Sequence, residues 1–90
     1  MKPSIQTQNA KQFLKNVNLS YIKTILSNIN FTEREKEIIN HILNGKSIKE
    51  ISIIMNLSLS YIAHLKQIIY EKIDLYIKLT KTVEEKNNIL

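Results

Sequence analysis

Few side chains in this sequence could carry out acid–base or metal chemistry. The only histidines are His41 and His64, the only aspartate is Asp74, and there is no cysteine. Two isolated histidines make a poor metal site or acid–base pair. We therefore expect no catalytic residue, no metal and no cofactor, and a binding protein rather than an enzyme.

The composition fits one small folded domain. Of the 90 residues, 43% are hydrophobic and 23% are charged, which is typical of a globular chain. One glycine and one proline are too few for a phosphate-binding loop or a turn-rich β fold. Apolar runs are short, so we expect a cytoplasmic protein with no membrane span and no secretory leader.

The net charge is positive and unevenly distributed. Thirteen Lys and Arg residues against eight Asp and Glu give +5, a balance that often accompanies nucleic-acid binding. Residues 1–30 hold four lysines and no acidic residue, whereas the charges of residues 31–58 cancel. The N-terminal lysines fit either a surface for DNA phosphates or ordinary solubilising charge.

The spacing of apolar residues predicts that helices position these charged and polar side chains. Apolar residues recur at steps of three and four after an irregular arm at 1–9, which predicts one amphipathic helix over about 10–29. Ser20 could cap a break in it, so two shorter helices remain an alternative. Thirty N-terminal residues are too few for a receiver or ligand-binding domain, so we expect control by protein abundance or by another protein.

Two capping boxes follow. The pairs Thr32–Glu35 and Ser47–Glu50 match the S/T-x-x-E pattern that satisfies N–H groups at a helix start. They predict helices over about 33–44 and 48–55, and Gly45 can end the first of them in a left-handed conformation.

A third helix should begin after Ser58, with Asn56 as a left-handed stop before it. Its predicted buried side is Ile62, Leu65, Ile69 and Ile73. No glycine or proline follows Gly45, so the last third could be one long helix, or Asp74 could cap a separate fourth helix. The sequence therefore predicts an all-α fold.

The helix at 48–55, its short turn and the helix after it match helix-turn-helix geometry. The runs FTEREKEII and LNGKSIKEI, followed by Leu57–Ser58 and Ile62, resemble the LuxR/GerE-type helix-turn-helix DNA-binding domain. A helix-turn-helix like that of sigma-factor region 4 shares this opening and is the alternative family. The resemblance implies a tri-helical core over 31–73, to which the apolar spacing adds an N-terminal arm and helix within 1–30 and a C-terminal helical extension over 74–90.

The resemblance also implies a set of DNA contacts. The base-reading positions of the family fall on Ala63, His64 and Gln67. Glutamine can pair with adenine through two hydrogen bonds, and histidine can donate to a guanine edge. The candidate phosphate contacts hold the backbone without specifying sequence; they are Lys46, Lys49, Ser58, Ser60, Tyr61 and Lys66.

The function so implied is a small DNA-binding transcriptional regulator with its recognition helix, about 59–73, in the major groove. A single recognition helix reads few base pairs, so we expect a homodimer, with Tyr76, Leu79 and Val83 as its apolar interface.

The sequence also departs from the family pattern. Ala63 and Leu65 replace basic residues, Asp74 replaces a glycine, and Ile53 and Ile54 replace polar residues. The alternative function is therefore a helix-turn-helix that binds protein, namely RNA polymerase or another transcription factor, through Ile53 and Ile54 or the N-terminal helix.

Overall fold

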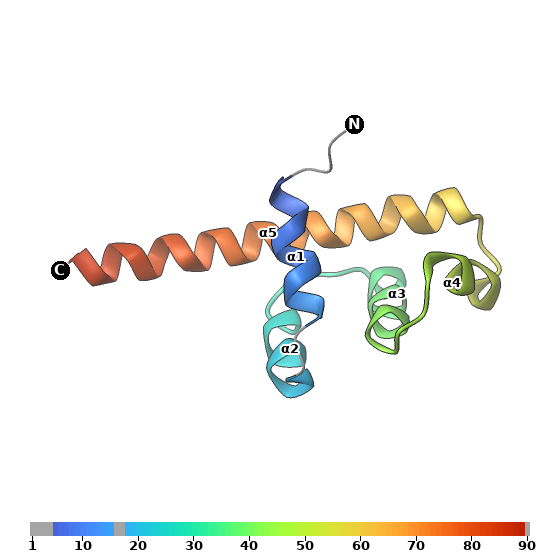
Figure 1. Cartoon of the computed structure of the whole chain (residues 1–90), viewed down its shortest axis with the longest axis horizontal. Helices are drawn as coiled ribbons and strands as arrows, with labels where there is room; N and C mark the ends of the chain where they lie inside the picture. Colours follow the sequence, from blue (N-terminus) through green and yellow to red (C-terminus); the bar gives the residue numbers. More distant parts are fainter. Residues whose placement is uncertain (1–4, 16–17, 90) are drawn as a thin grey trace. The chain divides into compact units, whose positions relative to one another are not determined.

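The computed structural model describes the backbone of residues 5–15 and 18–89, and the side chains of residues 10–15 and 18–80. This part of the chain is helical and contains no strand, as the sequence predicts. None of its helices is both long enough and apolar enough to cross a membrane. The helices are α1 (Ile5–Leu14), α2 (Leu19–Leu26), α3 (Glu33–Leu43), α4 (Ile48–Met55) and α5 (Leu59–Ile89) (Figure 1).

The chain forms two compact units. Asn30–Ile69 make one, here called the central unit, and Met1–Ile29 with Tyr70–Leu90 make the other, here called the terminal unit. The central unit holds α3, α4 and the start of α5, which are the three helices of the predicted helix-turn-helix core.

Both predicted capping boxes are confirmed in the central unit. The Thr32 hydroxyl accepts from the Glu35 N–H at 3.1 Å, and the Glu35 carboxylate accepts from the Thr32 N–H at 2.9 Å. Ser47 and Glu50 repeat both bonds at the same two distances. These reciprocal bonds satisfy N–H groups that the first helical turn leaves without intrahelical partners, so α3 and α4 begin where the sequence predicts.

Gly45 ends α3 as predicted. Its φ of +80° lies in the left-handed region, which glycine adopts without a Cβ clash. The reversal lets the Lys46 N–H donate to the His41 carbonyl at 3.0 Å, the bond that closes a Schellman-type helix end. The chain can then enter α4 after two further residues.

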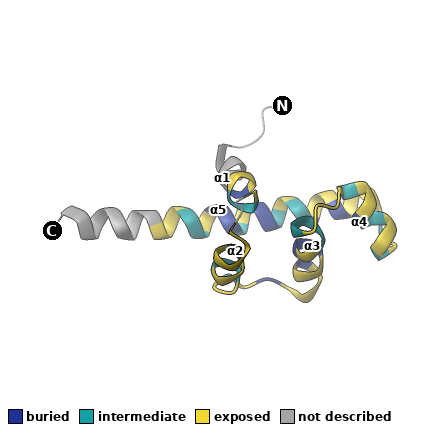
Figure 2. Cartoon of the chain, turned by 60° about the horizontal axis from the view of Figure 1, so that its bottom comes forward, coloured by how far each residue is buried: buried dark blue, intermediate teal, exposed yellow. Residues whose placement is uncertain are grey.

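Isoleucine dominates the core of the central unit. Ile38 on α3, Ile51 on α4 and Ile62 on α5 are each fully buried, so all three helices bury one face against the same core. The predicted buried side of the third helix is confirmed over its whole length (Figure 2). The other buried apolar residues of the unit are Phe31, Ile39, Leu65 and Ile69.

The prediction of one helix over 10–29 is wrong, and its alternative of two shorter helices is correct. α1 already begins at Ile5, within the expected irregular arm, and α2 starts at Leu19. Asn18, rather than Ser20, caps α2, because its side chain accepts from the Tyr21 N–H at 3.1 Å.

The last third of the chain is one helix. α5 continues without interruption from Leu59 to Ile89 (Figure 1), which excludes Asp74 as the cap of a separate helix. Asp74 is instead buried within α5, where its Oδ1 accepts from the backbone N–H of Ala10 at 2.7 Å. This bond joins α1 to α5 inside the terminal unit.

Candidate nucleic-acid interface

Ser52 makes two hydrogen bonds that close the turn between α4 and α5. Asn56 takes the left-handed conformation expected of it, with φ 54° and ψ 47°, and the Leu57 N–H then donates to the Ser52 carbonyl at 3.0 Å. The Ser52 hydroxyl donates in turn to the Leu57 carbonyl. These bonds fix the direction in which the chain leaves α4, and hence the start of α5.

Ser58 caps α5, as the sequence predicts. Its hydroxyl accepts from the Tyr61 N–H at 3.1 Å, and its carbonyl accepts from the Ile62 N–H at 3.1 Å. Ser58, Ser60 and Tyr61 are all exposed, so the first turn of α5 presents three side-chain hydroxyls to solvent. Hydroxyl donors at a helix N-terminus suit phosphate oxygens.

The first part of α5 has one buried and one exposed face. Ile62 and Leu65 point into the core, while Ala63, His64 and Gln67 are exposed. Residues three and four apart lie on one face of a helix, so the structure brings the three predicted base-reading positions together. All three positions are accessible to solvent.

Leu59 was missed by the sequence reasoning. It is the first residue of α5, its side chain is 51% exposed, and it lies four residues before Ala63. The two apolar side chains therefore border the polar pair His64 and Gln67. No spacing or capping signal in the sequence marks Leu59 as exposed.

The basic candidates are divided between two places. Lys46 precedes α4 and Lys49 is its second residue, and both are exposed, whereas the hydroxyls at the start of α5 follow the other end of α4 in the chain. Lys66 is half-buried on α5, and this burial lowers the pKa of its ammonium group.

Of the four carboxylates of the central unit, only that of Glu35 is buried. The Glu35 carboxylate is buried in its capping box, and the hydrogen bonds from Ser47, its backbone N–H first, lower the pKa of Glu50. Glu33 pairs with Lys36 at 3.1 Å. In the part of the chain whose side chains are described, no group of three or more His, Asp or Glu residues could hold a metal ion.

A second surface of the central unit is apolar. Ile53 is 73% exposed and Ile54 is 51% exposed, and they are the exposed large apolar residues of α4. Ile54 also borders an open hollow of about 380 Å³ between the side chains of α3 and the end of α4. The hollow is lined by Arg34, Glu37, His41, Ile54, Met55 and Leu57.

The proposed dimer residues are not equivalent in the structure. Tyr76 is half-buried in the terminal unit, and its hydroxyl accepts from the Asn28 side chain at 3.4 Å. Leu79 is 57% exposed and Leu75, which the sequence reasoning did not select, is 58% exposed. The side chain of Val83 lies outside the described residues.

Comparison with known proteins agrees with this geometry. The family model described as bacterial regulatory proteins, luxR family, matches residues 29–76, which include α3, α4 and the first part of α5. No curated protein and no solved structure matches the chain.

Proposed function

The chain belongs to the luxR family of bacterial regulatory proteins, and we propose that it is a small DNA-binding transcriptional regulator that acts as a homodimer. Residues 59–73 of α5 enter the major groove of duplex DNA, while α4 supports them. Residues 31–73 form the helix-turn-helix, with 1–30 as an N-terminal addition and 74–90 as a C-terminal element for dimerisation. Because its proposed ligand is double-stranded DNA, we place the protein in the bacterial cytoplasm.

The exposed face of α5 is the observation that carries the proposal. His64 and Gln67 can donate and accept hydrogen bonds at base edges, and Ala63 leaves room for a close approach. Leu59 and Ala63 add an apolar contact of the kind that thymine methyl groups favour. A helix with this face exposed, and with its opposite face fixed in a core, can read several adjacent bases without rearranging.

Backbone contacts would fix the register of this helix. The hydroxyls of Ser58 and Ser60 lie 3.5 Å apart at the start of α5, and with the exposed Tyr61 side chain they suit phosphate oxygens. Lys46, Lys49 and Lys66 add positive charge. Contacts of this kind orient the protein without selecting sequence.

Dimerisation is proposed through α5 in the terminal unit. Leu75 and Leu79 are four residues apart and both more than half exposed, so they form one apolar stripe on the helix. We prefer this pair to Tyr76, because the Tyr76 hydroxyl already bonds with Asn28. Val83 continues the stripe by its spacing of four.

An adaptor function is the alternative, favoured by the exposure of Ile53 and Ile54. In that case the apolar surface of α4 would bind RNA polymerase or another transcription factor. DNA binding by α5 does not require two exposed isoleucines on α4. Their exposure is therefore the reason to test the adaptor function as well.

A fluorescence anisotropy titration separates the two functions. Labelled random-sequence duplex is titrated with the full chain at 50 mM and 200 mM salt. A regulator binds at low salt and loses affinity steeply as salt rises, because phosphate contacts release counterions. Absence of binding at both salt concentrations would leave the adaptor.

A further inference from the structure

Most of the excess positive charge lies outside the helix-turn-helix. The central unit carries five Lys and Arg residues against four Asp and Glu, whereas the terminal unit carries eight lysines against four. Phosphate contacts supply most of the non-specific affinity for DNA. The unit that carries the base-reading face is therefore nearly neutral, and the charge that DNA binding needs lies elsewhere.

The N-terminal part of the terminal unit holds that charge without opposing carboxylates. Residues 1–30 contain no acidic residue. Lys11 and Lys15 are exposed at the C-terminal end of α1, and Lys23 is exposed on α2. Because residues 1–30 contain no carboxylate, no side chain of this segment competes with a phosphate for these lysines.

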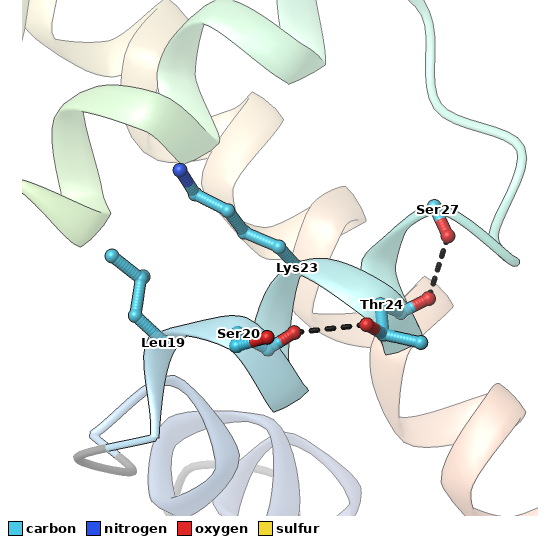
Figure 3. Close-up of a pocket in the computed structure, with 5 residues that line it drawn as sticks. All are labelled: Leu19, Ser20, Lys23, Thr24 and Ser27. Atoms are coloured by element: carbon cyan, nitrogen blue, oxygen red, sulfur yellow. Dashed lines mark hydrogen bonds between the residues drawn. The ribbon is translucent and has the colours of Figure 1, made fainter.

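α2 presents a polar, open surface around its lysine. Figure 3 shows Leu19 and Lys23 extending from the helix, with the Thr24 and Ser27 hydroxyls turned back onto its backbone. Those hydroxyls donate to the Ser20 and Thr24 carbonyls at 2.9 and 2.6 Å. The Lys23 ammonium group and the exposed Ser20 hydroxyl remain as the outward donors of this open hollow of about 550 Å³.

α1 is anchored to the part of α5 that belongs to the terminal unit. Ala10 is fully buried and its N–H donates to Asp74 at 2.7 Å. Lys11 follows Ala10 in the sequence. Burial raises the pKa of the Tyr70 hydroxyl, and the positive charge of Lys11 opposes this rise. Asp74 and Tyr70 both belong to α5, seven and three residues after Gln67.

We propose that Lys11, Lys15 and Lys23 form a second DNA-contacting surface, which binds phosphates of duplex DNA. The contact is independent of sequence and rests on the proposed DNA-binding function. All three lysines lie outside residues 29–76, the segment that matches the family model. The N-terminal helices thus supply the charge that the helix-turn-helix of this chain lacks.

The test measures how affinity depends on salt. Lys11, Lys15 and Lys23 are replaced together by glutamine in the full chain, and binding to random duplex is followed by anisotropy from 50 to 300 mM salt. Each lysine that meets a phosphate contributes about 0.9 to the slope of log affinity against log salt. We expect the slope of the triple variant to fall by about 2 to 3, and the sequence preference to stay unchanged.

Lys36 provides the matched control. It is exposed on α3 and paired with Glu33 at 3.1 Å, so Lys36→Gln removes the same charge as Lys23→Gln from a different place. We expect Lys23→Gln to lower the slope by about 0.9, Lys36→Gln to leave it unchanged, and Lys23→Arg to restore it. Circular dichroism at 222 nm verifies that each variant remains folded.

The outcomes separate the inference from the function on which it rests. Binding by the original chain with an unchanged slope in the triple variant overturns the inference and leaves the DNA-binding function intact. Equal losses in Lys23→Gln and Lys36→Gln also overturn it, because net charge alone would then explain the effect. No binding by the original chain at any salt overturns both.

Discussion

The backbone N–H of Ala10 donates a hydrogen bond of 2.7 Å to the carboxylate of Asp74, 64 positions later in the chain. Asp74 is only 5% exposed, and in the described part of the chain its Oδ2 atom is buried without a hydrogen-bond partner. Burial raises the pKa of this carboxyl group, while the bond from Ala10 opposes the rise. One buried acid therefore holds α1 on α5 at an electrostatic cost.

This cost predicts a pH-dependent stability. A carboxyl group whose pKa is higher in the folded than in the unfolded protein stabilises the fold at low pH, and this contribution is lost as pH rises through the folded pKa. Asp74→Asn keeps an oxygen acceptor for Ala10 but cannot ionise. We expect the unfolding free energy of the original chain, relative to that of Asp74→Asn, to fall in urea titrations as the pH rises above the ordinary aspartate pKa of about 4. Parallel pH profiles would show that Asp74 does not titrate with folding.

The left-handed turn residue gives a second prediction. Asn56 has φ 54°, a conformation that costs an alanine about 1 kcal/mol or more and a glycine nothing. Asn56→Ala should therefore lower the unfolding free energy by about 1 kcal/mol, while Asn56→Gly should leave it unchanged or slightly raised. Urea unfolding measures both, and equal stability of the two variants would contradict the role given to this turn.

The exposed Leu59 predicts a contact with thymine. In a duplex selected for tight binding, replacing each thymine by deoxyuridine removes only the 5-methyl group from the major groove. We expect one such replacement to weaken binding of the original chain by a few-fold, and the same replacement to have no effect on Leu59→Ala. Equal losses in both proteins would mean that Leu59 does not touch a methyl group.

The apolar stripe on α5 predicts the oligomeric state. Leu75→Ser with Leu79→Ser should convert a dimer to a monomer in sedimentation velocity, without a large loss of fold stability, because both side chains are more than half exposed. Ile53→Ser with Ile54→Ser is the matched control, since these isoleucines are also apolar and more than half exposed but lie on α4. If the isoleucine variant is a monomer, or the leucine variant remains a dimer, the dimer interface does not lie on Leu75 and Leu79.

The central unit was predictable because local chemistry marks every boundary in it. Thr32, Ser47 and Ser58 each cap a helix, and Gly45 and Asn56 each take a left-handed conformation. The three/four spacing of isoleucines then fixes which face of each helix is buried. In this unit the helix limits set by local caps and turns match the helix limits that the buried core requires.

The terminal unit was harder to predict because its boundaries have weaker signals. The apolar spacing continues across the break before Leu19, and Asn18 was overlooked as its cap. Asp74 has the residue type of a cap, yet its partner is Ala10, and only tertiary packing brings these two together. Within the candidate site the spacing predicts the shared face of His64 and Gln67, whereas the exposure of Leu59 and Leu75 required the structure.

Sequence selection with the two polar residues of α5 removed is the most direct test of the proposed reading face. The original chain and the double variant His64→Ala with Gln67→Ala each select duplexes from a random library, which is then sequenced. We predict a defined motif for the original chain and a loss of preference at several adjacent positions for the variant, with nearly unchanged affinity for random duplex. The same motif, enriched equally by both proteins, would contradict the claim that this face of α5 reads bases.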